Sequence, residues 1–245
     1  MTTLPVFLVE RLPDGPQAVL DGPEGHHAAT VRRLRVGESL VLCDGRGGLA
    51  RCAVRDVGRD TVTLAVDERW IEPAPQLRVV LAQALAKGNR GELAVELATE
   101  AGVDEILPWR AARCVVTWDD GPRGDRALGK WRSTAREAAK QARRAWCPPV
   151  GDPLATPALA DRARAAALTL VLHESADRGL GDVTMPTAGD LLLVVGPEGG
   201  ITESEIAVLG SAGAVPVRLG PTVLRTSTAA AVALGAIGPL TRRWE

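Results

Sequence analysis

The part of the sequence best suited to chemistry is a glycine-rich turn that carries one carboxylate. The apolar run "LLLVV" (191–195) leads into Gly196, Pro197, Glu198, Gly199 and Gly200. Glycines permit positive φ and let a ligand approach the backbone closely. The next residues, Thr202 to Glu205, match a capping box, and a helix N-terminus offers free N–H donors. The motif predicts either a ligand-binding loop with Glu198 beside the reacting groups, or an ordinary strand-to-helix turn.

A second loop combines an arginine with hydroxyl groups. In "RLGPTVLRTSTAA" (218–230), Gly220 and Pro221 interrupt a strand-like run. Arg225 then stands directly before the hydroxyl residues Thr226, Ser227 and Thr228. Such residues are favoured at helix N-termini, and the alanines after them favour a helix. Arg225 would either neutralise an anion in a site or pair with a carboxylate at the surface.

Basic residues gather between positions 110 and 150. This segment has ten Lys and Arg residues and only four Asp and Glu, in a chain whose net charge is −1. Every fourth residue from 132 is basic, which predicts one charged face of a helix over about 125–146. That face would either bind phosphates or be solvated. The candidate RNA-binding residues are Arg132, Arg136, Lys140, Arg143 and Arg144, with a smaller cluster of Arg32, Arg33 and Arg35.

The composition argues against several classes of site. The four cysteines form no Cys-x-x-Cys pair and have no histidine cluster nearby, so we expect neither a metal ion nor a disulfide framework. Neither standard nucleotide-binding glycine motif occurs, and no nucleophile elbow or Ser-His-Asp arrangement is recognisable. No apolar run approaches a membrane span and the N-terminus lacks a signal-peptide pattern, so we expect a cytoplasmic protein that does not bind membranes.

The elements that must position these residues fall into two groups. Short alternating strands with hairpin turns between them fill residues 1–72, which favours a small barrel or compact sheet domain. After a proline-containing linker, strands near 77–85, 105–109, 114–118, 168–174, 190–196 and 214–220 alternate with helices near 89–102, 125–146, 202–212 and 227–240. This alternation predicts a parallel α/β sheet over 77–245. Ligands of such sheets bind at the carboxyl ends of strands, where the loops after 172, 195 and 218 lie.

The two C-terminal loops together resemble those of the SPOUT-class RNA methyltransferases. "VVGPEGGITESEI" and "VRLGPTVLRTSTAA" carry the resemblance. Within that class the chain is similar to the RsmE-type family, which methylates N3 of a uridine in 16S (small-subunit) ribosomal RNA. "HHAATVRRLRVGESLVLCDGRGG" resembles the family's N-terminal PUA-like domain, and "ALAKGNRGELAVELATEAGVDEILPWRAARCVV" and "STAREAAKQARRAWCPPV" resemble its central segments. The resemblance covers nearly the whole chain.

The resemblance implies a fold, a cofactor and partners. It implies a PUA-like RNA-binding β-barrel over 1–72 and, over 77–245, an α/β domain with a deep C-terminal trefoil knot. It implies a homodimer that uses S-adenosyl-L-methionine and acts on small-subunit ribosomal RNA, and we expect Ala230, Val232, Leu234 and Ile237 to leave apolar surface for the partner. The positions that match the cofactor loops are Leu172, His173, Gly196, Pro197, Glu198, Gly199, Gly200, Ile201, Leu219, Gly220, Pro221, Leu224, Arg225, Thr226, Ser227 and Thr228.

The sequence departs from the family pattern at three places. The family usually has Arg-Thr-Glu in the last loop, where this chain has Arg225-Thr226-Ser227, so a carboxylate that could act as a base is missing. Val6 replaces an arginine before Phe7, and Leu97 replaces a common lysine. The candidate catalytic residues are then Arg225, to stabilise negative charge on the uridine, and Glu198, to accept a proton or attract the sulfonium. Glu198 would otherwise only hydrogen-bond backbone amides.

Two other functions compete with methyl transfer. The loss of the glutamate at Ser227 favours a non-catalytic RNA-binding or ribosome assembly factor that keeps the fold, whereas the intact cofactor loops argue against it. A nucleotide-dependent oxidoreductase on an ordinary α/β sheet is the second alternative. Affinity for S-adenosylmethionine, or for NAD, would separate these hypotheses.

Overall fold

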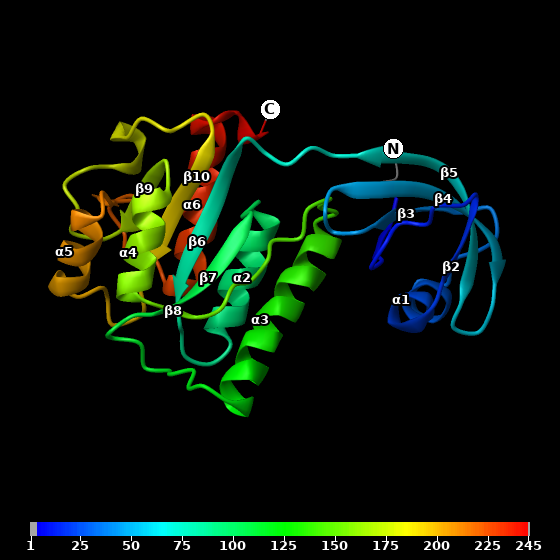
Figure 1. Ribbon diagram of the computed structural model, residues 1–245, viewed down its shortest axis with the longest axis horizontal. Helices are drawn as coiled ribbons and strands as arrows, with labels where there is room; N and C mark the ends of the chain where they lie inside the picture. Colours follow the sequence, from blue (N-terminus) through cyan, green and yellow to red (C-terminus); the bar gives the residue numbers. More distant parts are fainter. Residues whose placement is uncertain (1–3, 245) are drawn as a thin grey trace. The chain divides into compact units, whose positions relative to one another are not determined.

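The structure is a computed structural model that describes residues 4–244, and its chain forms two compact units (Figure 1). The first unit comprises the residues up to Ala74 together with Ala139–Cys147. The second comprises Pro75–Ala138 and the residues from Pro148 onward. The sequence did not indicate that 139–147 belong with the N-terminal residues. The domain bounds 1–72 and 77–245 themselves stay a prediction.

The first unit is built on one curled, five-stranded sheet. Its order is β1 (Val6–Leu8), β3 (Ser39–Cys43), β4 (Gly48–Val57), β5 (Val62–Ile71) and β2 (Gln17–Leu20). Only β1 and β3 are parallel. Helix α1 (Gly22–His26) and a π-helical turn (His27–Val31) connect β2 to β3. Within residues 4–244 the edge strands β1 and β2 do not pair with each other, so this is the compact sheet that the sequence pattern allowed, and not the closed barrel that the resemblance implied.

The second unit is built on a six-stranded sheet in which every strand pair is parallel. Its order is β11 (Val215–Val217), β9 (Leu168–Leu172), β10 (Gly189–Val195), β6 (Leu77–Ala84), β7 (Glu105–Arg110) and β8 (Leu154–Ala155). The predicted parallel α/β sheet is confirmed. All carboxyl ends of its strands therefore lie at one edge, which is where ligands of such sheets bind.

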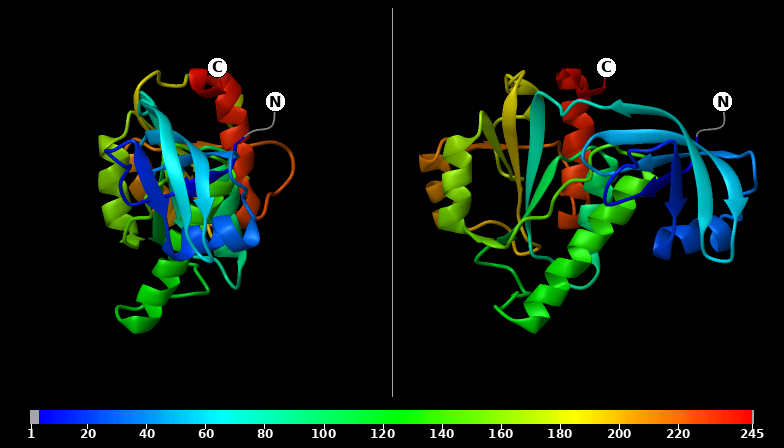
Figure 2. Two further views of the ribbon diagram at one scale, coloured as in Figure 1. Left: turned by 90° about the vertical axis from the view of Figure 1, so that its right-hand side faces the viewer. Right: turned by 45° about the vertical axis from the view of Figure 1, so that its right-hand side comes forward.

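Helices cover both faces of this sheet (Figure 2). Helices α2 (Arg90–Glu100), α3 (Pro122–Gln141) and α6 (Thr226–Leu240) pack on one face, against residues such as Leu81 and Leu193. Helices α4 (Thr156–Ala165) and α5 (Glu203–Ser211) pack on the other face, against residues such as Ala82 and Val194, which directly follow Leu81 and Leu193 in their strands. Short 3₁₀ turns occur at Leu180–Asp182 and Arg242–Trp244. Because successive strand residues point to opposite faces, both faces require apolar side chains, and this explains the continuous apolar runs.

Helices α2 and α3 are each terminated by a residue in the left-handed backbone conformation. Gly102, with φ +100, follows α2, and the amide of Val103 donates to Ala98 O at 3.0 Å. The predicted stop at Gly102 is thus confirmed. Arg143, with φ +56, ends α3 in the same way, and the amide of Arg144 donates to Ala139 O at 2.9 Å. These are Schellman caps, which satisfy the last free carbonyls of a helix. Helix α3 therefore spans 122–141, where the sequence indicated about 125–146.

The strand predicted at 114–118 is absent. Exposure alternates along it, since Val115 and Thr117 are exposed while Val116 is half-buried and Trp118 is buried, and this alternation is typical of a strand. No neighbouring strand pairs with it, and its backbone stays irregular. Several short elements were not predicted, among them α1, β8 and α4. None of the helices within 4–244 has both the length and the apolar character needed to cross a membrane.

A buried ion pair in the first unit corrects the predicted basic row. Lys140 Nζ lies 2.7 Å from Glu24 Oε1 and 3.2 Å from His27 Nδ1, and its side chain is only 5% exposed. It also lies over the Phe7 ring. Lys140 is therefore not on an exposed helix face, and Arg144 lies beyond the end of α3. Residues spaced four apart share one face only as long as the helix continues, and α3 ends at Gln141.

This contact predicts a difference between two basic residues of the same helix. We expect Lys140→Ala to destabilise the first unit by about 3 kcal/mol, because it leaves the Glu24 carboxylate without its buried partner. Arg136→Ala removes an exposed side chain and should change stability by less than about 0.5 kcal/mol. Denaturant dependence of amide hydrogen exchange measures both, in β3 and β4 of the first unit for Lys140→Ala and in β6 and β10 of the second unit for Arg136→Ala. Equal effects from the two substitutions would contradict the structural role of Lys140.

Candidate functional site

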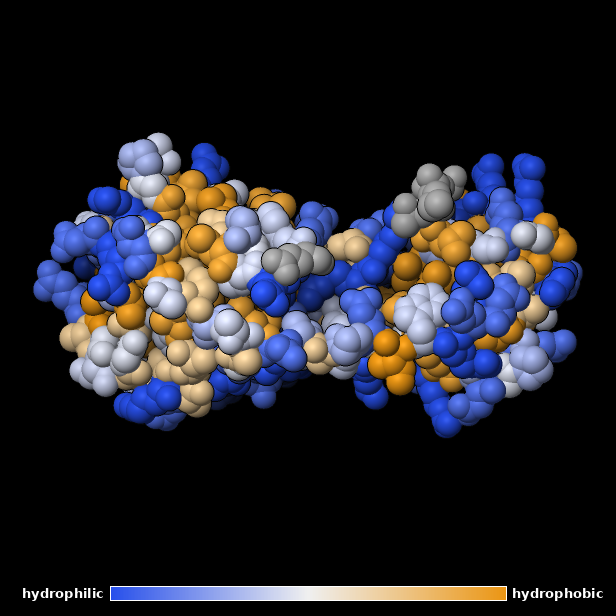
Figure 3. Space-filling view, turned by 90° about the horizontal axis from the view of Figure 1, so that it is seen from above, coloured by the Kyte–Doolittle hydropathy of each residue, from blue (hydrophilic) through white to orange (hydrophobic). Residues whose placement is uncertain are grey.

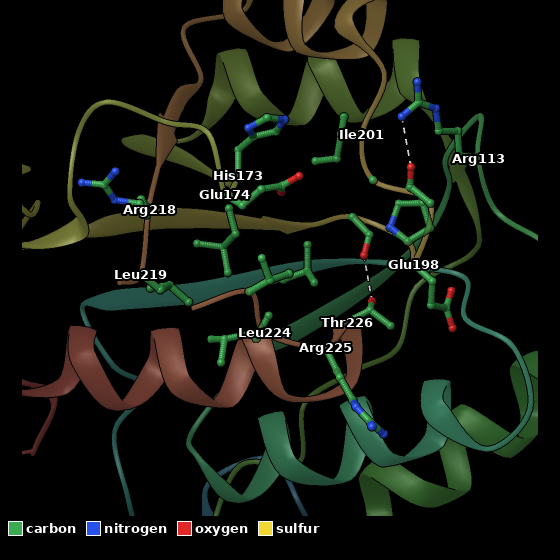
Figure 4. Close-up of a pocket in the computed structure, with 18 of the residues that line it drawn as sticks. Arg113, His173, Glu174, Glu198, Ile201, Arg218, Leu219, Leu224, Arg225 and Thr226 are labelled. Carbon is green, nitrogen blue, oxygen red and sulfur yellow. Dashed lines mark hydrogen bonds between the residues drawn. The ribbon is translucent and has the colours of Figure 1, made fainter. Parts of the chain in front are cut away.

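Three loops that leave the parallel sheet at its carboxyl edge enclose one pocket of about 690 Å³ (Figure 4). They follow β9, β10 and β11, as the sequence predicted for this type of sheet. The lining residues are Arg90, Arg113, Leu172, His173, Glu174, Val195, Gly196, Pro197, Glu198, Gly199, Gly200, Ile201, Glu203, Val217, Arg218, Leu219, Gly220, Thr222, Val223, Leu224, Arg225, Thr226 and Ala229. The pocket mixes apolar side chains, glycine backbone and charged groups.

The pocket contains most of the predicted cofactor positions and several residues that the sequence did not indicate. Pro221, Ser227 and Thr228 are the predicted positions that do not line it, and Ser227 is buried. Arg90, Arg113, Glu174 and Arg218 are charged residues that sequence reasoning missed. Glu174 follows His173 directly and could have been found from that loop. Arg113 lies in the loop after β7, and nothing in the spacing of residues along the sequence predicts that its side chain reaches the pocket.

The glycines of the turn after β10 are needed for different reasons. Gly200 has φ +76, a conformation that other residues rarely adopt. A Cβ on Gly196 would lie 2.6 Å from Ile201 Cγ1, and one on Gly199 would lie 3.1 Å from Arg113 Cβ. Arg113 Nη1 donates to Gly199 O at 3.0 Å, the contact drawn in Figure 4. The turn therefore needs glycine both for its backbone path and for close packing against neighbouring loops.

Glu198 is held by an ion pair. Arg90 Nη1 lies 3.0 Å from Glu198 Oε1, and the amide of Lys87 donates to the same oxygen at 3.3 Å. Partial burial would raise the pKa of Glu198, but hydrogen bonds from its own amide, from Arg90 and from Lys87 outweigh burial and lower the pKa below its usual value. The carboxylate is thus charged, and its position is fixed relative to the start of α2.

Arg225 stands where α6 begins. Its backbone carbonyl accepts the amides of Thr228 and Ala229, and its side chain is exposed. Within residues 4–244 the side chain has no hydrogen bond or ion pair. In Figure 4 the guanidinium group points away from the centre of the pocket, toward α2. Its charge is therefore free to contact a bound group at the rim of the pocket.

A buried hydrogen-bonded chain ties α6 to the glycine-rich turn. Gln83 Nε2 donates to Thr226 Oγ1 at 2.9 Å, and Thr226 Oγ1 donates to Gly196 O at 2.8 Å. Gln83 is fully buried in β6, opposite Val195 of β10. Burying a polar group costs free energy unless it is hydrogen-bonded, so these two bonds are part of what keeps Gln83 and Thr226 in the interior. The chain therefore fixes the loop after β10 and the loop after β11 relative to each other.

The Glu205 carboxylate joins three further segments. Oε1 accepts from the Ala112 amide at 2.8 Å and from Thr156 Oγ1 at 3.1 Å, and Oε2 accepts from the Thr202 amide at 3.0 Å and from Thr202 Oγ1 at 2.8 Å. The predicted capping box at Thr202–Glu205 is confirmed. Burial would raise the pKa of Glu205, but these hydrogen bonds prevail and lower the pKa. The loop after β7, the start of α4 and the start of α5 depend on this one group.

The other predicted RNA-binding residues lie on both units. Arg32, Arg33 and Arg35 are exposed after the π-helical turn, and Arg33 has φ +54. Arg136 and Arg143 are exposed too. Arg132 donates to Val150 O and pairs with Asp152 at 3.0 Å. The predicted residues are therefore separate positive charges and not one continuous helix face.

Comparison with known proteins identifies the family. Residues 72–238 match an RNA methyltransferase domain, and residues 20–67 match an RNA methyltransferase PUA domain. Ribosomal RNA small subunit methyltransferase E of Mycobacterium tuberculosis is 57% identical over 98% of this chain and 93% of its own length. The chain belongs to the ribosomal RNA small subunit methyltransferase E family. The Bacillus subtilis member is 32% identical over 93% of this chain and 92% of its own length.

Solved structures of methyltransferases have the same fold along the whole chain. A small subunit methyltransferase E from Neisseria gonorrhoeae, bound to S-adenosylmethionine, has a TM-score of 0.85 and 26% identity, over 98% of both chains. A Legionella pneumophila methyltransferase in complex with the same cofactor has a TM-score of 0.87 and 28% identity, over 98% of this chain and 99% of its own. The predicted family is confirmed by these relatives.

The Glu205 contacts predict a pH-dependent loss of stability. In Glu205→Gln, an amide NH₂ replaces one acceptor and faces groups that are themselves donors, so we expect the second unit to lose about 1–3 kcal/mol at pH 7. Because the folded pKa is lowered, the carboxylate stabilises the fold fully above the ordinary glutamate pKa of about 4.3, and this contribution fades as pH falls through the folded value. Urea unfolding at pH 7 and pH 3 should show the gap between the two proteins narrowing in acid. A constant gap would contradict the role of the charge.

Proposed function

We propose that the protein transfers the methyl group of S-adenosylmethionine to N3 of a uridine in 16S, small-subunit ribosomal RNA. Membership of its family makes it an S-adenosylmethionine-dependent ribosomal RNA methyltransferase. The observation that carries the proposal is that the three loops after β9, β10 and β11 meet in one pocket. The assignment of a uridine as the substrate nucleotide, and of N3 as the methylated atom, rests on the resemblance of the two C-terminal motifs to those of the RsmE type.

The pocket fits such a cofactor in size and in chemistry. Its volume of about 690 Å³ lies in the usual range of about 300–1,000 Å³ for ligand pockets. Leu172, Ile201, Leu219 and Leu224 provide apolar surface for an adenine ring, and the glycine-rich turn exposes backbone amides and carbonyls. Bound S-adenosylmethionine would supply an electrophilic methyl group on a positively charged sulfur. We assign its binding to the predicted positions that line the pocket.

Arg225 and Glu198 would act by their charges. Attack by N3 requires loss of its proton, which leaves negative charge on O2 and O4 of the uracil, and the unpaired Arg225 guanidinium can stabilise that charge. Glu198 is already paired with Arg90 and its pKa is lowered, so it is a weak proton acceptor. We assign it the electrostatic role, as a fixed negative charge near the sulfonium. The pocket would orient base and methyl group for in-line transfer.

The proposal includes a trefoil knot and a homodimer in the cytoplasm. The contact between Thr226, after β11, and Gly196, after β10, means that the two loops that would form the knot are adjacent, as a knot requires. Ala230, Leu234 and Ile237 are buried within the chain, so the expected apolar surface at those residues was wrong. Val232, the fourth residue of that set, is 45% exposed as expected, and Val223 and Leu240, at 79% and 45%, are further exposed apolar residues that support a partner. Hydrophobic residues reach the surface between polar ones on the face in Figure 3.

The test of this function is a map of methylated nucleotides in small-subunit ribosomal RNA. We expect RNA from cells that lack the gene to lose one N3-methyluridine, and the purified protein with S-adenosylmethionine to restore it. The departure at Ser227 favours the alternative of a non-catalytic assembly factor. That alternative predicts cofactor-independent RNA binding and an unchanged methylation map, and this result would overturn the proposal.

Arg225 offers a sharper test of the mechanism. We expect Arg225→Ala to lower the single-turnover rate by about 10²–10³, with S-adenosylmethionine affinity nearly unchanged, since the guanidinium has no partner within the described chain. Arg225→Lys should recover only part of the rate, because an ammonium lacks the planar fork of donors. If Arg225 instead holds the loop, both variants lose cofactor affinity and thermal stability together. Near-normal rates in the alanine variant would remove the residue from the mechanism.

A further inference from the structure

A second cavity, of about 340 Å³, opens at the loop between β7 and α3. It is lined by Arg110, Ala111, Ala112, Cys114, Val116, Thr117, Trp118, Asp119 and Asp120. Apolar side chains and half-buried Cys114 form part of its wall, and a charged pair, Arg110 with Asp120 at 3.3 Å, stands at its rim. Apart from the Ala112 amide, which donates to Glu205 Oε1, no group of this lining belongs to the pocket described above.

The backbone beside this cavity makes no hydrogen bond to the rest of the described chain, so its partner is solvent or a ligand. Within residues 4–244, no hydrogen bond involves a main-chain N–H or C=O of residues 115–118. Backbone groups in folded proteins almost always find a partner, either in the protein, in water or in a ligand. This segment has the alternating exposure of a strand but no strand beside it. Its free donors and acceptors can therefore bind a flat ligand that carries both kinds of group, such as the edge of a nucleobase.

One wall of the cavity is rigid and aromatic. Trp118 packs edge-to-face on Trp131 of α3, with ring centroids 4.9 Å apart, and its side chain is 9% exposed. Arg110 and Asp120 are 41% and 99% exposed, so their ion pair is weak and a phosphate can displace the carboxylate at little cost. The cavity thus combines a tryptophan that is largely buried but lines its wall with an arginine at its rim, and aromatic and cationic groups together are typical of single-stranded nucleic-acid sites.

The cavity lies beside the proposed reaction pocket. Arg113 lines the reaction pocket and donates to Gly199 O, while its neighbours Ala112 and Cys114 line the second cavity. The Ala112 amide is held by Glu205, at the start of the helix that follows the glycine-rich turn. Both cavities are therefore at the carboxyl edge of the sheet, separated by one short loop.

We propose that this cavity binds the base of an RNA nucleotide that flanks the methylated uridine, with Arg110 contacting its phosphate. The inference rests on the proposed function, since it needs an RNA substrate in the first pocket. The cavity would help hold the strand while the target base is unstacked, which enzymes that act on nucleobases require. A second copy of the chain pairing with residues 115–118 is the competing occupant.

The test fills the cavity from its exposed mouth. In Thr117→Trp, the new ring should occlude the cavity, so we expect the KM for small-subunit RNA to rise about tenfold or more while S-adenosylmethionine affinity stays unchanged. Val208→Trp is the control, because Val208 is an exposed residue of α5 that lines neither cavity and lies outside residues 115–118. Arg110→Ala should also raise KM and lower the salt dependence of binding, whereas Arg123→Ala, at an exposed arginine that does not line the cavity, should raise KM less.

RNA with single abasic positions then identifies the bound nucleotide. We expect one abasic substitution next to the target to weaken methylation by wild-type protein, and to have no further effect in Thr117→Trp. Additive losses, or normal kinetics in Thr117→Trp, would overturn the subsite. A variant that dissociates a dimer in sedimentation would assign the cavity to a second copy instead, and would also overturn it. If wild-type protein transfers no methyl group at all, the proposed function fails, which is a distinct result.

Discussion

The functional half of the molecule depends on the parallel order of its sheet. Because all six strands run in one direction, every loop that follows a strand leaves at the same edge. Proximity alone would leave these loops free to move. Two buried polar groups hold them: Thr226 joins the loops after β10 and β11, and Glu205 joins the loop after β7 to the starts of α4 and α5. The pocket is therefore a consequence of topology that hydrogen bonds then make rigid.

The features that follow local rules could be predicted from the sequence. The buried strands, the capping box at Thr202 and the stop at Gly102 depend on residue types a few positions apart, and each lies where expected. The glycine-rich turn and the start of α6 were found for the same reason. Their meeting in one pocket followed from the alternation of strands and helices, since that pattern specifies a parallel sheet.

The features that depend on distant partners could not be predicted. The pattern at 114–118 is that of a strand, but a strand needs a neighbour, and none is present. Lys140 continued a basic row in the sequence, yet Glu24 and His27, more than a hundred residues earlier, bury it. Arg113 and Arg90 reach the pocket through contacts with Gly199 and Glu198 that no spacing rule contains. In each case, tertiary contacts override the local pattern.

The surroundings of each basic residue separate those that support the fold from those available to RNA. Lys140 is buried with its carboxylate, and losing that partner would leave an unpaired charge in the interior. Arg132 with Asp152, Lys130 with Glu92 and Arg110 with Asp120 each have an exposed cation, and such pairs add little stability. A phosphate can replace those carboxylates at small cost. A pair of this kind orients the cation without burying it, so under the proposed function these exposed cations, and not Lys140, are the candidates for contact with RNA phosphates.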